Sequence, residues 1–134
     1  MNVKKLLIAF LAVGVVMNII DYVMFTVIMK ESIAANPILR QDASPVWFII
    51  IDFVSALVVV WVFDKVRGSF KAGVAGGALY GFYAGVLLNF PTWIGLSLII
   101  KGFEYKQAWF WTGYGVIWML IAGCIAGFIY KPKT

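Results

Sequence analysis

Four long apolar runs decide what this chain can fold into. They cover residues 6–29, 46–63, 72–100 and 108–130, and charged or turn-forming residues separate them. Runs of ~18–29 residues match the ~20 residues that a helix needs to cross a hydrocarbon core about 30 Å thick. Because lipid offers the backbone no hydrogen-bond partner, each run must be helical. The sequence therefore predicts an all-α membrane protein, with a single domain of four transmembrane helices in an up-down bundle.

The composition agrees with a membrane protein and argues against several soluble functions. Apolar residues make up 63% of the chain and charged residues 13%, against ~45–50% and ~25% in soluble proteins. The net charge of +5 comes from Lys and Arg near the predicted helix ends, so no nucleic-acid partner is expected. Histidine is absent and Cys124 is the single cysteine, which removes the usual metal ligands and nucleophile–base pairs. We therefore expect no enzyme activity, no metal and no cofactor.

The distribution of basic residues predicts the orientation of the spans. An even number of spans places both termini on one side, and that side holds most of the basic residues. They are Lys4, Lys5, Lys65, Arg67, Lys71, Lys131 and Lys133. The positive-inside rule then places both termini in the cytoplasm of a bacterial-type inner membrane. The aromatic residues expected in the interfacial belt are Trp47, Tyr105, Trp109, Trp111 and Tyr130.

Polar side chains inside the spans mark the candidate site. Asp21 and Asp52 are the most informative, since a carboxylate in hydrocarbon costs at least ~2.5–3.5 kcal/mol unless it faces protein, water or a partner. At ~1.5 Å per residue, all four spans bring polar groups to one layer in the outer half of the membrane. The predicted cluster is Asn18, Asp21, Tyr22, Asp52, Ser55, Asn89, Thr92 and Tyr114. Each member could equally do no more than hydrogen-bond a neighbouring helix.

A stripe of glycines predicts a close helix contact. Gly73, Gly77, Gly81 and Gly85 recur every four residues in the third run, so they share one face of a helix. Small residues at this spacing let two backbones approach each other in a membrane. We expect a packed seam, either inside the subunit or between subunits.

The first and third runs suggest an internal repeat. With a shift of 71 residues, Gly14 falls on Gly85, Asn18 falls on Asn89, and the apolar residues between them also match. A real repeat would make the chain two helix hairpins related by an axis along the membrane normal, as in some transporter halves. The parallel relation of the two hairpins is a hypothesis about architecture more than about activity.

Three functional interpretations stay open. In the first, which the sequence favours because no coupling motif is present, the chain is an auxiliary or structural subunit of an oligomer or larger membrane complex. In the second, it is a small proton- or cation-coupled transporter or channel that uses Asp21 and Asp52. In the third, it is a membrane-embedded enzyme or a quinone- or lipid-handling subunit. The expected partners are membrane lipids, and other membrane subunits or further copies of the chain.

Overall fold

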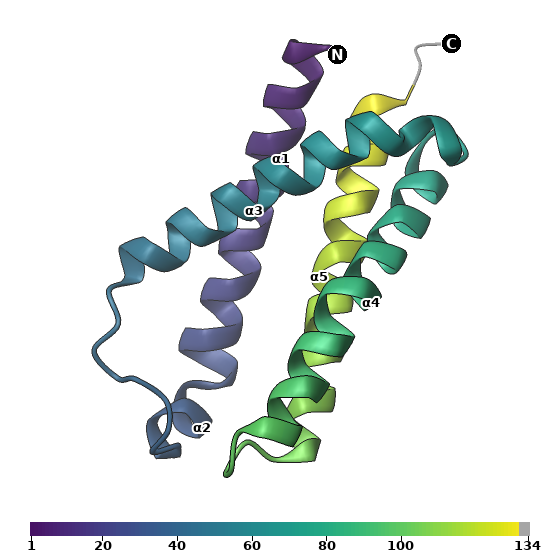
Figure 1. The fold of residues 1–134 in the computed structure, drawn as a ribbon. Coiled ribbons are helices and arrows are strands. Elements are labelled where there is room, and N and C mark those ends of the chain that lie inside the picture. The colour runs from purple at the N-terminus through teal and green to yellow at the C-terminus, as the bar shows by residue number, and fades with distance from the viewer. Residues whose placement is uncertain (132–134) are drawn as a thin grey trace.

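Four long helices form the body of the protein (Figure 1). The computed structural model describes residues 1–131, so Lys133 of the predicted charge bias lies outside the described residues. The long helices are α1 (Val3–Val23), α3 (Pro45–Val66), α4 (Val74–Ile99) and α5 (Tyr105–Tyr130). All four, with their flanking turns, are long and apolar enough to cross a membrane. The prediction of an all-α membrane protein with four transmembrane helices in a bundle is confirmed.

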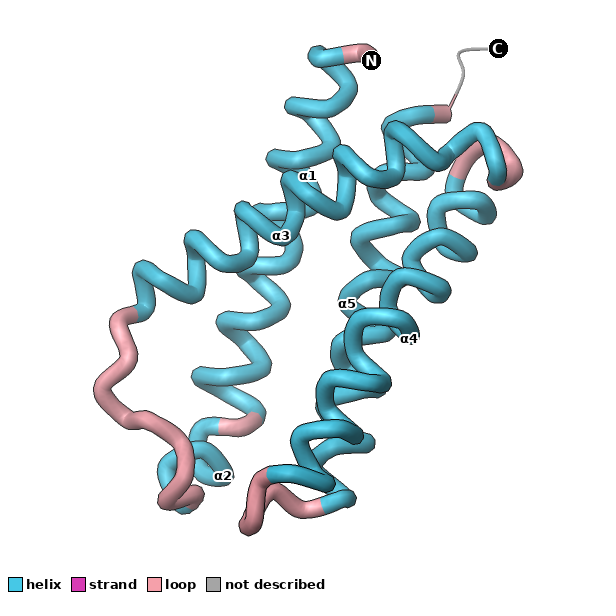
Figure 2. The backbone as a smooth tube through the Cα atoms, viewed as in Figure 1, coloured by secondary structure: helices cyan, strands magenta, loops and turns pink. Residues whose placement is uncertain are grey.

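Shorter elements complete the chain between the long helices. A π-helical turn, η1 (Met24–Ile28), continues α1, and a 3-10 turn, η2 (Arg67–Ser69), ends α3. A short helix, α2 (Lys30–Ala35), opens the long connection to α3. Figure 2 shows that this connection is much longer than those before α4 and α5.

The long helices alternate in direction along the bundle. The N-terminus, the end of α5 and the connection from α3 to α4 lie at one end, which we call the terminal end (Figure 1). The connection through α2 and the connection from α4 to α5 lie at the opposite end, which we call the loop end (Figure 2). Polar residues set these boundaries: the Asn2 side chain accepts a hydrogen bond from the Lys5 amide, and Glu104 and Gln107 form a reciprocal cap on α5.

The apolar core fills the half of the bundle nearest the terminal end. Small and medium side chains from α1, α3 and α5 meet there with no exposed surface, among them Ala9, Val13, Ala56, Ala122 and Ala126. Larger rings close the end of the core, where Phe63 contacts Tyr80 and Tyr130 with ring centroids 5.1 and 5.8 Å apart. Dense packing of this kind excludes water from among these core side chains. A cleft of about 440 Å³ lies beyond them at the terminal end, lined by residues that include Asp64, Arg67 and Lys71.

Helices α4 and α5 pack directly backbone to backbone. A Cβ added to Gly77 would meet the carbonyl of Gly123, and one added to Gly81 would meet the carbonyl of Met119. A Cβ on Gly85 would lie 3.0 Å from Cα of Val116. Gly73 precedes the helix with a φ of 88°, and its carbonyl carbon lies 3.0 Å from where a Cβ of Gly127 would be. The glycine stripe of α4 therefore lies on α5, inside the subunit.

Helix α3 crosses the bundle at a steep angle and separates from α4 toward the loop end (Figure 1). Near the terminal end the two helices are joined by a hydrogen bond of 2.9 Å, which the Tyr80 hydroxyl donates to the Val59 carbonyl. The bundle is therefore closed at the terminal end and open at the loop end.

Candidate functional site

A cleft of about 920 Å³ occupies the open half of the bundle. We call it the loop-end cleft. All four long helices contribute to its walls, as do α2 and both connections at the loop end. Its polar lining residues are Asp21, Arg40, Asp52, Ser55, Asn89 and Tyr114. Its aromatic lining residues are Phe25, Phe48, Trp93, Phe103, Trp111, Tyr114 and Trp118.

Two carboxyl groups from different helices meet in this cleft. Asp21 of α1 and Asp52 of α3 both line this cleft, and Asp52 is only 7% exposed. The hydroxyl of Tyr114 on α5 donates a hydrogen bond to Oδ1 of Asp21. Asp52 comes seven residues after the start of α3 at Pro45, which at 1.5 Å per residue places it ~10 Å along the helix. The acid pair, Asp21 and Asp52, therefore lies within the depth of the spans.

A series of near-parallel aromatic rings lines the cleft on the side of α4 and α5. Phe25 stacks on Trp111 with centroids 5.6 Å apart and planes 18° apart. Trp111 lies 5.6 Å from Trp93, and Trp93 lies 6.1 Å from Phe103, with planes 28° and 20° apart. We call these four residues the aromatic wall. Phe25 joins it from the π-helical turn η1, a distortion that often accompanies functional sites.

Asn89 holds one part of this wall in place. Its amide donates to the Gly85 carbonyl at 2.9 Å, and its Oδ1 accepts a hydrogen bond from the indole of Trp93 at 3.3 Å. Gly115 on α5 makes room for the Asn89 side chain, since a Cβ at that position would collide with the amide oxygen. Asn89 therefore orients Trp93 and uses both of its polar atoms to do so.

A single basic residue lines the mouth of the cleft. Arg40 lies in the connection between α2 and α3 and pairs with Asp42, with Nη1 and Oδ1 3.9 Å apart. Both side chains are largely exposed, at 76% and 81%. An ion pair this exposed is screened by water and contributes little stability. Asp42 therefore compensates the charge of Arg40 only weakly, and Arg40 remains a positive charge near the opening.

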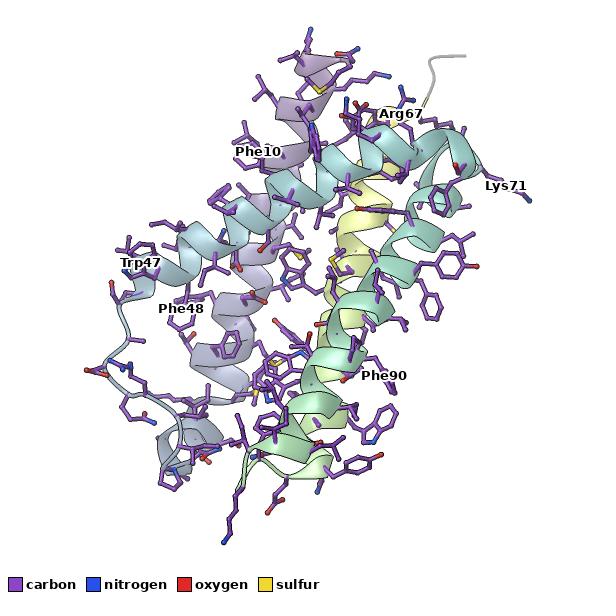
Figure 3. All side chains as sticks on the ribbon, viewed as in Figure 1. Phe10, Trp47, Phe48, Arg67, Lys71 and Phe90 are labelled. Atoms are coloured by element: carbon purple, nitrogen blue, oxygen red, sulfur yellow. The ribbon has the colours of Figure 1, made fainter. Side chains whose placement is uncertain are left out.

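A third carboxylate, Asp64, lies at the terminal end and differs from the acid pair. Its side chain is 4% exposed and pairs with Arg67, with Oδ1 and Nε 3.4 Å apart. Arg67 also lies over the ring of Tyr130, 5.2 Å from the centroid. Figure 3 shows Arg67 near this end of α3 and Trp47 and Phe48 near its other end. Asp64 is therefore compensated by a fixed cation, whereas the acid pair has only hydrogen-bonding partners nearby.

The structure brings together five of the eight residues of the predicted polar cluster. Asp21, Asp52, Ser55, Asn89 and Tyr114 line the loop-end cleft. The other three lie outside it. Asn18 donates to the Gly14 carbonyl of its own helix at 2.8 Å, and Thr92 donates to Leu88 of its own helix at 2.5 Å. Tyr22 is 67% exposed, because one step along a helix rotates a side chain by about 100° away from Asp21.

The aromatic belt also needs correction at two positions. Trp47, Tyr105 and Trp109 are exposed near helix ends, but Trp111 lies in the aromatic wall and Tyr130 is 3% exposed in the core. Four aromatic residues of the cleft were not predicted from the sequence: Phe25, Trp93, Trp111 and Trp118. One signal was available: Trp111, Tyr114 and Trp118 have the i, i+3, i+7 spacing of one helix face, which here is the face toward the cleft.

The cleft offers a ligand two carboxyl groups and a wall of aromatic rings. Within residues 1–131, no group of three or more Cys, Asp or Glu side chains is arranged to hold a metal ion. Comparison of the chain with family models, curated proteins and solved structures finds no match. The geometry of the site therefore carries the functional argument by itself.

Proposed function

We propose that the chain is a small proton- or cation-coupled transporter that binds its cation at Asp21 and Asp52 in the loop-end cleft. The observation that carries this proposal is the meeting of two membrane-embedded carboxyl groups at the wall of a cleft of about 920 Å³. Intramembrane carboxylates that face a cavity are the usual carriers of protons and cations.

Electrostatics supports a cationic occupant. Two ionised carboxylates in one cleft repel each other where water is scarce, and a proton or a cation held by them reduces this repulsion. The Tyr114 hydroxyl offers a hydrogen bond to Asp21 but no charge. Asp21 and Asp52 can thus hold protons or a cationic solute in alternation, which is the minimum requirement for coupling.

The shape of the bundle supports transport with one side open at a time. The loop-end cleft opens toward one face, and the core of alanine, valine and aromatic side chains closes the other. A change in the crossing of the α1/α3 pair against the α4/α5 pair would open the terminal end, in the manner of transporters built from two packed units. The positive-inside rule places the terminal end in the cytoplasm of a bacterial-type inner membrane.

Flux through reconstituted protein tests this function. Liposomes with a pH gradient across the membrane receive sodium, potassium or an organic cation, one at a time, on the side opposite to the higher proton concentration. A dye inside the liposomes reports proton movement. The native chain is expected to dissipate the gradient with at least one of these cations. Asp21→Asn and Asp52→Asn should each reduce the flux to that of protein-free vesicles, because asparagine keeps the size but cannot exchange a proton or neutralise a cation.

The matched control is Glu31→Gln, which removes an exposed carboxylate that lies outside the spans and does not line the cleft. It should retain the native flux. Native flux in both cleft variants, or no flux from the native chain with any of the cations, would contradict the transporter proposal.

A second candidate is an auxiliary or structural subunit, and one observation favours it. Within the chain α4 packs almost entirely on α5, which leaves an apolar outward face with Phe82, Tyr83 and Leu87 at 44%, 57% and 72% exposure. That face could contact lipid, a second copy or another membrane subunit. A stable complex recovered in mild detergent, together with absence of flux, would favour this candidate. The parallel repeat stays a prediction under either function.

A further inference from the structure

We propose that the occupant of the loop-end cleft is an organic monocation that carries apolar or aromatic groups, and that the aromatic wall recognises it. This inference rests on the proposed function, because it names the class of cation that Asp21 and Asp52 would hold. Its basis is the position of the wall, formed by Phe25, Trp93, Phe103 and Trp111, in the same cleft as the two carboxyl groups.

The aromatic wall suits a cation whose charge is spread over carbon groups. A ring face attracts a cation within about 6 Å of its centroid, and tryptophan does so best. Two of the four rings are tryptophans, and the centroid spacings of 5.6–6.1 Å are those of offset rings rather than a closed stack. Quaternary ammonium and similar ligands are recognised by such combinations of rings and negative charge.

The polar groups of the cleft suit a bare inorganic cation less well. Such an ion needs several oxygen ligands to replace its water. The amide oxygen of Asn89 already accepts from the Trp93 indole, and the Tyr114 hydroxyl donates to Asp21, so each offers a cation only its remaining lone pairs. The other side-chain oxygens are those of the acid pair and Ser55, in a lining dominated by apolar side chains. The size of the cleft also lies in the ~300–1,000 Å³ range of pockets for drug-sized ligands.

The charge of the lining agrees with a cation. Asp21 and Asp52 are the two carboxyl groups of the lining, and a cation bound beside them would compensate negative charge that is costly to leave unpaired in the membrane. Arg40 is the one basic side chain that lines the cleft, and it lies at the exposed mouth and pairs with Asp42. Its charge opposes the approach of a cation, so its removal should strengthen binding.

The arrangement of the helices gives such a ligand a route. Residues of both α3 and α4 line the cleft, and the two helices diverge toward the loop end (Figure 1), so we expect a ligand to enter from the side of the bundle, where lipid lies. An organic cation with apolar groups partitions at the membrane interface, and it could reach the acid pair from there without first crossing the outer solution.

Equilibrium binding to the purified full-length chain tests this inference. The probes are tetraphenylphosphonium, a monocation with four phenyl groups, and tetraphenylborate, an anion of the same shape. We expect saturable binding of the cation, measured by titration calorimetry, and none of the anion. Trp111→Ala should weaken binding of the cation by at least about 10-fold, while Trp111→Phe keeps a ring face and should lose about 2–5-fold.

Trp109→Ala is the matched control, since Trp109 lies on the same helix, is 48% exposed and does not line the cleft. It should leave the affinity unchanged, and Arg40→Gln should raise it by about 2–5-fold. Each variant is first shown to elute as the native chain does in size exclusion. Equal losses in Trp109→Ala and Trp111→Ala, equal binding of both probes, or no saturable binding of the phosphonium would each overturn the inference.

The result can be told apart from failure of the proposed function. If the cation does not bind but the Asp→Asn variants still abolish proton flux driven with sodium or potassium, the transporter proposal stands and the organic ligand is wrong. If the cation binds with the expected losses but no gradient produces flux, the cleft is a binding site without transport.

Discussion

The two helix pairs of the bundle, α4/α5 and α1/α3, contain helices of similar length but pack in opposite ways. In the α4/α5 half, glycines such as Gly77, Gly81 and Gly123 bring the backbones together along most of the helices. In the α1/α3 half, side chains keep the backbones apart: Gly14 seats the Phe53 ring, which meets Phe10 edge to face at 5.8 Å. Residue size at the contact therefore makes one half a tight pair and the other a splayed pair.

This difference explains where the cleft forms. The tight pair supplies Asn89, Trp93, Trp111 and Tyr114 from two helices that cannot easily move relative to each other. The splayed pair supplies the two carboxyl groups, and its long connection through α2 lets α3 turn away from the bundle (Figure 2). A rigid aromatic surface thus faces an acidic surface that has room to adjust.

The largest effect is expected where the tight pair is forced apart. Gly81→Leu should lower the free energy of unfolding in detergent by ~3 kcal/mol or more, because even its Cβ would meet the Met119 carbonyl. Thermal unfolding followed by circular dichroism measures this loss. Gly95→Leu is the control in the same helix, since no atom lies within 4 Å of the added Cβ. Similar stability in the two variants would mean that the seam between α4 and α5 is not close-packed.

A smaller effect compares the two halves directly. Gly14→Ala and Gly81→Ala gain the same helix propensity, ~1 kcal/mol, so the difference between them isolates packing. The new methyl group meets the Phe53 ring in the first case and backbone in the second. A ring can shift but a helix backbone cannot, so Gly14→Ala should be more stable than Gly81→Ala by ~1–2 kcal/mol. Equal unfolding free energies would remove the distinction between a tight and a splayed pair.

The sequence could predict one part of this architecture and not the other. Span number and alternation follow from hydropathy, because only helices of this length satisfy the backbone in lipid. The four-residue glycine period pointed to a close contact, and the partner helix could not be read from it. Hydropathy carries no information on crossing angles, so neither the divergence of α3 from α4 nor the resulting cleft could be predicted from the sequence.

The site shows the same limit at the level of single residues. Asp21, Asp52, Asn89 and Tyr114 were identifiable because polar groups are costly in lipid and must find one another. Thr92 was included because of its depth in the span, but the structure turns it outward and places Trp93 in the cleft. A tryptophan is compatible with lipid, interface or cavity, so its direction could not be predicted from its chemistry.

The smallest effect is expected at the hydrogen bond that joins α4 to α3. Tyr80→Phe removes the bond to the Val59 carbonyl but keeps the ring contacts with Phe63 and Phe70, at 5.1 and 6.0 Å. Hydrogen bonds between membrane helices contribute ~0.6 kcal/mol on average, and the α3 helix itself still supplies Val59 with a donor. We expect a loss of about that size in thermal unfolding, and none for the control Tyr83→Phe, whose side chain is 57% exposed. Because this bond lies at the closed end, its loss should also loosen the point about which α3 and α4 diverge. A Tyr80→Phe variant as stable as the native chain would show that side-chain packing, and not this hydrogen bond, holds α3 to α4.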